Sequence, residues 1–152
     1  MANVQHSALT GSDLHEPKGV ASATAGKVYI SDGSGSGAWT SAGEIITGYI
    51  DDVSTIEVVH VPMPFAGTIS KVITVLEGAI SNDDATITVK NDSAASMGTL
   101  TITQLDSAAG DVATLSPTVN NTVTANTFIT VETDGESTSH KKLRFAVVLD
   151  KS

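Results

Sequence analysis

Apolar and polar side chains alternate with a period of two through most of the chain from Glu44 onward. At 85–90, Ile87 and Val89 alternate with threonines, which is the pattern of a strand with one buried face. Clusters of Gly, Pro, Asn and Asp separate such runs and predict turns. The runs that predict strands are residues 45–50, 55–61, 67–76, 85–90, 99–103, 127–133 and 143–149, with a shorter run at 112–115.

This pattern predicts an all-β body over residues 44–152. No segment has a helical period, and parallel strands would need crossover helices, so the strands are expected to pair antiparallel in a β-sandwich. Pro62 and Pro64 are expected to end the ladder of the second strand, because proline has no N–H to donate. The last strand is expected to face the core with Leu143, Phe145, Val147 and Leu149.

Residues 1–43 have a different pattern. Their apolar side chains are thinly scattered, and the run 31–37 is Gly- and Ser-rich like a linker. Only 27–30 predicts a short strand, closed by a turn at Asp32-Gly33. We therefore expect an extended N-terminal arm over 1–43, which cannot bury enough apolar surface to fold alone and becomes ordered against a partner.

Charge limits the partners that the chain can have. Eight basic residues against 17 acidic ones give a formal net charge of −9, and Arg144 is the single arginine. Because nucleic-acid binding depends first on Lys and Arg neutralising phosphates, neither nucleic acid nor an anionic membrane is an expected partner. The N-terminus lacks the pattern of a signal peptide, so we expect synthesis in the cytosol of a host cell.

No constellation of residues predicts catalysis, a metal or a cofactor. The chain has no cysteine, and its histidines have no metal-ligand spacing. The match to a nucleophile elbow at 33–37 lies in the linker-like run, outside a strand-to-helix turn. The acidic pair Asp51-Asp52 is expected to face water, and a loose Ca²⁺ site at Asn82-Asp83-Asp84 is left open. We therefore expect neither an enzyme nor a small-molecule substrate.

Two parts of the chain resemble structural proteins of tailed bacteriophages. Residues 6–20, His-Ser-Ala-Leu-Thr-Gly-Ser-Asp-Leu-His-Glu-Pro-Lys-Gly-Val, followed by 28–33 and 35–40, resemble a segment that recurs in those virion proteins as an N-terminal attachment arm. Residues 61–69, Val-Pro-Met-Pro-Phe-Ala-Gly-Thr-Ile, and their continuation to Leu76-Glu77-Gly78 are similar to a phage head-decoration domain.

The resemblance implies a jelly-roll-like antiparallel β-sandwich that acts as a capsid decoration, or cement, protein on the outside of a phage head. It further implies a homotrimer that binds the major capsid protein and is located on the capsid surface of the virion. The arm residues that would bind the capsid are His6, Leu9, Leu14, His15, Pro17, Val28, Tyr29 and Trp39.

A receptor- or glycan-binding module of a tail or head fibre is the alternative. It would need aromatic platforms in the body, where only Tyr49, Phe65, Phe128 and Phe145 occur. The sequence leaves open whether the protein sits on head, tail or fibre, and which host and oligomeric state it has.

Overall fold

The computed structural model describes residues 27–34 and 37–152, and this part of the chain contains strands and no helix. The chain divides after Thr40 into two units, which are described separately. The strands are β1 (Lys27–Ser31), β2 (Gly37–Ser41), β3 (Gly43–Ile50), β4 (Val58–Met63), β5 (Gly67–Leu76), β6 (Ala85–Asn91), β7 (Ser96–Ile102), β8 (Val112–Leu115), β9 (Thr122–Val123), β10 (Thr127–Thr133) and β11 (Leu143–Lys151).

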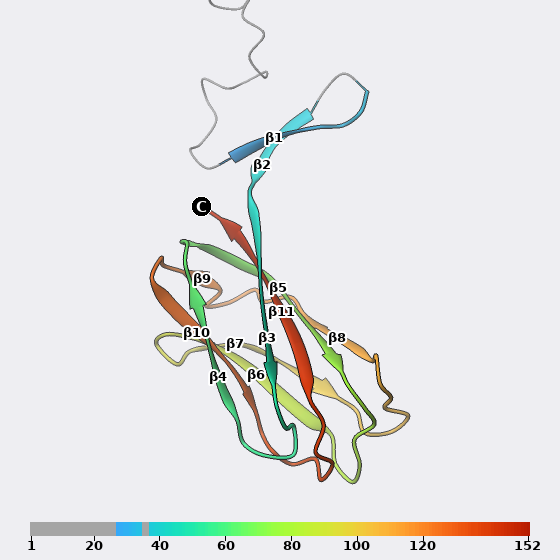
Figure 1. Cartoon of the computed structure of the whole chain (residues 1–152). Coiled ribbons are helices and arrows are strands. Elements are labelled where there is room, and N and C mark those ends of the chain that lie inside the picture. The colour runs from blue at the N-terminus through green and yellow to red at the C-terminus, as the bar shows by residue number, and fades with distance from the viewer. Residues whose placement is uncertain (1–26, 35–36) are drawn as a thin grey trace, which may run out of the picture. The chain divides into compact units, whose positions relative to one another are not determined.

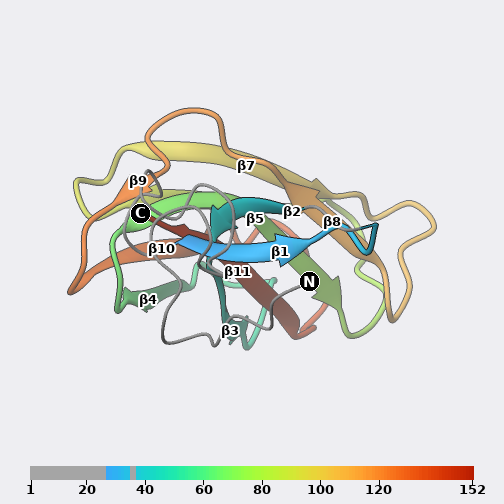
Figure 2. The same cartoon turned by 90° about the horizontal axis from the view of Figure 1, so that it is seen from above.

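The unit that begins at Ser41 is a sandwich of two antiparallel sheets (Figures 1 and 2). One sheet has the order β3-β11-β5-β8, with the two-residue β9 pairing with β5, and the other has the order β4-β10-β6-β7. If the strands of this unit are numbered one to eight in chain order, leaving out β9, the first sheet has the order 1-8-3-6 and the second the order 2-7-4-5. This is the double Greek-key arrangement of a jelly roll. The predicted all-β, jelly-roll-like antiparallel sandwich is confirmed.

The core lies between the two sheets and follows the alternation of the sequence. Every second residue of β11 is buried, as predicted, and β5, β6 and β10 contribute in the same way. The one buried polar group on β5, Thr74, donates its hydroxyl to the Ala113 carbonyl. The largest fully buried side chains are Ile50, Met63, Ile69, Leu76, Ile87, Met97, Ile129, Leu143 and Leu149.

Gly48 in β3 is required by the packing of Phe145. The two residues are register partners in neighbouring strands, and a Cβ atom on residue 48 would lie 2.5 Å from the Phe145 ring. Any larger residue at 48 would therefore displace the ring from the core.

The predicted bounds of the second strand, residues 55–61, are wrong at both ends, because β4 runs from Val58 to Met63. Residues 55–57 form a turn region instead, because Asp52 accepts hydrogen bonds from the backbone N and the hydroxyl of Ser54. Pro62 does not end the ladder but lies within β4, opposite Phe128. β4 is the edge strand of its sheet, and an edge strand tolerates proline where the missing N–H faces away from the ladder. In the sandwich, the other differences are the earlier start of β7, the short β9, and extensions of one or two residues in β3, β6 and β11.

In the N-terminal unit, β1 and β2 form a two-stranded sheet. Five residues connect them, too few for a parallel crossover, so they form an antiparallel hairpin. The predicted turn at Asp32-Gly33 is confirmed: Asp32 accepts a hydrogen bond from the backbone N of Ser34, and Gly33 has a φ of 75°. The linker-like run predicted over residues 31–37 ends earlier than expected, because Gly37 is the first residue of the strand β2.

Candidate functional site

Two aromatic side chains hold the β1–β2 hairpin together. The rings of Tyr29 and Trp39 pack edge to face, with centroids 5.4 Å apart at 66°. Gly37 makes this possible, because a Cβ atom there would lie 2.3 Å from the Ile30 carbonyl oxygen and 2.8 Å from the Tyr29 ring. The hairpin thus presents a half-buried aromatic pair on one face.

Its other face is aliphatic and exposed. Val28 and Ile30 alternate with Tyr29 along β1, and their exposed fractions are 43% and 58%. Beside them, β2 contributes the exposed Ala38 and Thr40. No described residue of this hairpin is fully buried.

Three of the eight predicted attachment residues lie on this hairpin. Tyr29 and Trp39 are brought into contact, whereas Val28 lies on the opposite face. The remaining five, His6, Leu9, Leu14, His15 and Pro17, lie outside the described residues.

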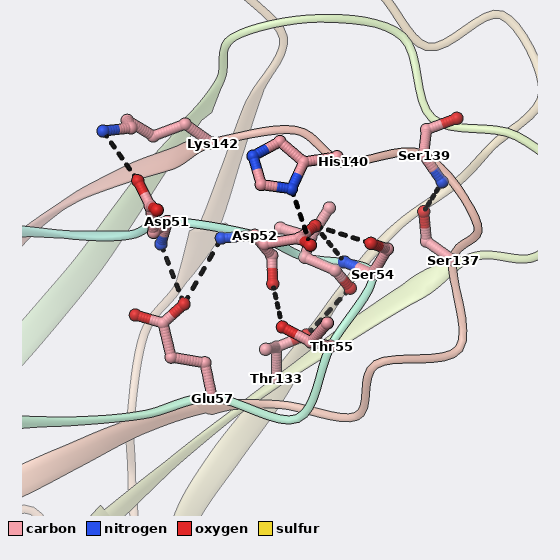
Figure 3. A network of polar contacts seen from close by, with 11 residues as sticks. Asp51, Asp52, Ser54, Thr55, Glu57, Thr133, Ser137, Ser139, His140 and Lys142 are labelled. Atoms are coloured by element: carbon pink, nitrogen blue, oxygen red, sulfur yellow. Dashed lines mark hydrogen bonds and ion pairs between the residues drawn. The ribbon is translucent and has the colours of Figure 1, made fainter.

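A second cluster of candidate residues is a polar network between β3 and β4 (Figure 3). The Glu57 carboxylate accepts hydrogen bonds from the backbone N of Asp51 at 2.9 Å and of Asp52 at 3.3 Å. Asp51 pairs with Lys142 at 2.9 Å, and Asp52 lies 2.8 Å from Nδ1 of His140. Strand ends far apart in the sequence are thereby tied together.

Electrostatics supports a structural role for this network. Desolvation raises the pKa of Asp52, but hydrogen bonds from Ser54 and His140 outweigh it, so its pKa lies below the ordinary value of 3.8. The hydrogen bond with Asp51 raises the pKa of Lys142. Asp52 is mostly covered, contrary to the expectation that both acids of this pair face water.

The order of contacts in the network is not that of a nucleophilic triad. Ser54 Oγ donates to Asp52 at 2.6 Å, and His140 contacts the other oxygen of the same carboxylate. Activation of a serine needs the imidazole between the hydroxyl and the acid. Asp52 here bridges the other two and orders the loop.

At Asn82-Asp83-Asp84, two of the three candidate Ca²⁺ ligands already hold neighbouring loops. Asn82 Nδ2 donates to Thr138 at 2.6 Å, and Asp84 Oδ1 accepts from the backbone N of Gln104 at 2.7 Å. Over residues 27–34 and 37–152, no three His, Asp or Glu side chains gather as metal ligands would.

The outer faces of the two sheets differ in polarity. On the β4-β10-β6-β7 sheet, threonines surround a Lys90–Glu132 ion pair, whose hydrogen bond lowers the pKa of Glu132. His60 and Phe128 pack there with ring centroids 5.0 Å apart. The β3-β11-β5-β8 sheet also carries Lys71 and Arg144 on its outer side, but most of the side chains there are apolar. We name this set the apolar outer face: Ile45, Tyr49, Ile73, Val75, Val112, Ala146 and Val148.

Sequence reasoning missed the apolar outer face. Ala146 lies opposite Thr47 on one side and Ile73 on the other, and a hollow of about 370 Å³ opens around it. Ile45 and Tyr49 are 66% and 52% exposed. The available signal was that both alternating sets of side chains in 45–50 are largely apolar, which marks a strand with two apolar faces.

In the described part of the chain, no helix is long and apolar enough to span a membrane. No protein-family model matches the chain. No curated protein is similar to it in sequence. Among solved structures, a chain from work on Bacillus endospore appendages, described as a novel family of disulfide-linked pili, aligns with 74% of this chain and 90% of its own length. The identity is 13% and the TM-score 0.35, which is too low to support any argument about fold or function.

Proposed function

We propose that this protein is a decoration protein that binds the outside of a tailed-phage head and stabilises the shell by bridging capsid subunits. The N-terminal unit would attach to the major capsid protein, and the jelly-roll unit would form the body. The resemblance of residues 6–40 to phage attachment arms is the observation that carries the proposal.

The structure supports this division of labour through the contrast between the units. The sandwich has its own core, while the hairpin exposes Val28 and Ile30 and half-buries Tyr29 and Trp39. Burying one such side chain against a partner contributes about 1.5–3 kcal/mol. A hairpin with these four side chains can therefore supply substantial binding energy without loss of the body's fold.

The proposed mechanism is mechanical. A protein that binds the assembled shell and not the dispersed subunits stabilises the shell by mass action. Association into a homotrimer would multiply weak contacts into avidity.

A pelleting assay tests the attachment role. Heads that lack the protein are mixed with the full chain or with a variant that begins at Ser41, and bound protein is measured in the pellet. We expect the full chain to sediment with heads and the shortened chain to stay in solution with the circular dichroism spectrum of a folded sandwich. A shortened chain that pellets as well as the full chain would contradict the proposal.

The alternative, a receptor- or glycan-binding module of a fibre, is favoured by one observation. The His60–Phe128 ring pair lies on an exposed sheet surface, where Phe128 is 38% exposed. The face of an aromatic ring is apolar and carries the negative part of its quadrupole, so it packs well against the C–H groups of a sugar ring. Substitution of Phe128 by alanine would lower adsorption to host cells under this alternative, and would leave adsorption unchanged under the decoration role.

A further inference from the structure

The sandwich has four edge strands, and three of them are protected from pairing with another chain. β4 carries Pro62, and β8 is only four residues long. β7 has a register irregularity opposite Val89 and Lys90, and the side chain of Asn120 donates to the Ser96 carbonyl at its start. Proline, short length, bulges and covering loops are the features by which proteins protect sheet edges.

Over residues 27–34 and 37–152, the fourth edge, β3, has none of these features. It is eight residues long without proline, and its pairing with β11 is regular from Gly43 to Ile50. Its one charged residue, Glu44, is held by Lys151 at 2.7 Å. In the described part of the chain, β11 is its only sheet neighbour. A long, regular and largely apolar edge is a template for another strand.

The sequence of β3 is complementary to itself. Antiparallel neighbours keep their faces matched only if residues of the same parity stand opposite each other. Centred on Thr47, this places Ile45 opposite Tyr49 of a second copy, and Thr47 opposite Thr47 of the second copy. Aromatic–β-branched and Thr–Thr pairs are favourable cross-strand pairs. A register centred on Ile46 loses them, because Tyr49 would then stand opposite Gly43.

Charge at the two ends of β3 does not oppose this register. One end holds the Glu44–Lys151 pair and the other the Asp51–Lys142 pair. Each acid is paired with a base of its own copy, so neither acid is left to repel a second copy.

We propose that β3 is a self-association edge, at which two copies of this chain pair antiparallel about a two-fold axis at Thr47 and join their β3-β11-β5-β8 sheets. The apolar outer faces of the two copies then become one continuous surface. The contact does not depend on the proposed capsid role. If the body is itself trimeric, the same edge joins neighbouring trimers.

Charge substitution at the two-fold tests the proposal. Sedimentation velocity of the full chain over a concentration series should show a reversible step that doubles the mass. Thr47→Lys and Thr47→Glu each place like charges directly opposite across the axis, which should weaken this step at least about tenfold. An equimolar mixture of the two variants should restore it, with mixed species exceeding the unmixed ones in native mass spectrometry.

The matched control is Thr114→Lys, at another exposed threonine, on the outer side of β8 in the same sheet. It should leave the association unchanged. Three results would overturn the proposal: wild type that never doubles its mass, Thr47→Lys that associates like wild type, or a mixture that stays dissociated. If wild type does not self-associate and Thr47→Lys loses binding to heads, β3 accepts a capsid strand instead.

Discussion

The sandwich and the β1–β2 hairpin are both built from β-strands, but they are stabilised differently. Side chains from both sheets of the sandwich form one continuous buried core. The hairpin has no fully buried residue among those described and relies on the Tyr29–Trp39 ring pair. An isolated two-stranded hairpin is marginally stable in water, whereas a sandwich of this size folds alone. The body therefore carries the stability, and the hairpin keeps apolar surface for a partner.

The largest effect on this contrast is expected from Phe145→Ala. It removes a buried ring that packs on Gly48, so the free energy of unfolding of the sandwich should fall by about 3–5 kcal/mol. Far-UV circular dichroism in urea follows the sandwich, and Trp39, the single tryptophan, follows the hairpin by fluorescence. The variant should shift the first transition and leave the second in place. If the dichroism and fluorescence transitions coincide and shift together, the sandwich and the hairpin unfold as one cooperative unit. That result would contradict the contrast drawn between them.

Glu57→Ala should have the next largest effect, and again only on the sandwich. Its carboxylate accepts two backbone N–H groups at the start of the β3–β4 loop, and hydrogen bonds to charged groups contribute about 1.5–3 kcal/mol each. Since Glu57 is only partly covered, we expect a loss of about 1–2 kcal/mol in urea unfolding. Glu136→Ala, at an exposed glutamate of the β10–β11 loop, is the matched control and should change little. If Glu57→Ala and Glu136→Ala lower the free energy of unfolding equally, the polar network around Glu57 does not stabilise the sandwich.

The pH dependence of sandwich stability should be smaller in Asp52→Asn. The pKa of Asp52 is lowered in the folded state, so its contribution is complete above the unfolded-state value near 3.8 and is lost as pH falls through the folded value. Wild type should therefore lose stability more steeply than the variant as pH is lowered below about 4. Urea unfolding at several pH values gives the two slopes, and identical slopes would refute the assignment.

The smallest effect on stability, and the largest on attachment, is expected from Trp39→Ala. The dichroism transition of the sandwich should not move, because Trp39 lies in the other unit. Binding to heads should weaken about tenfold to a hundredfold, as burial of such a side chain contributes about 1.5–3 kcal/mol. Phe128→Ala removes an exposed ring from the body and serves as control. If heads bind Trp39→Ala and Phe128→Ala equally well, the hairpin is not the attachment site.

Alternation predicted the strands of the sandwich because one of their faces is buried, so that the sequence 143–149 directly shows which residues enter the core. It did not predict β2, whose residues 37–41 combine small and hydroxylated side chains without a clear apolar stripe. Pro62 was misread because local sequence does not tell whether a strand lies at an edge. Strand order is likewise a property of the whole fold, and the jelly roll was expected only from the resemblance.

For the candidate site, the sequence predicted Tyr29 and Trp39 as attachment residues but not that their rings are in contact. Tyr29 and Trp39 were singled out one by one, and their contact depends on the pairing of β2, which the pattern of that segment did not reveal. The roles of Asp52 and Glu57 depend on partners that only the fold brings near, such as His140. The open edge of β3 became visible only once the other three edges were placed.

Thermal release of DNA from virions tests the central claim, that this protein stabilises a phage shell, most directly. Virions with and without the protein are heated with a DNA-binding dye, and fluorescence marks the temperature at which DNA escapes. We predict release at a lower temperature from virions that lack the protein, and recovery that increases with the concentration of added protein. Release at the same temperature from both virions, together with weaker adsorption to host cells, would contradict the decoration role and favour the receptor-binding alternative.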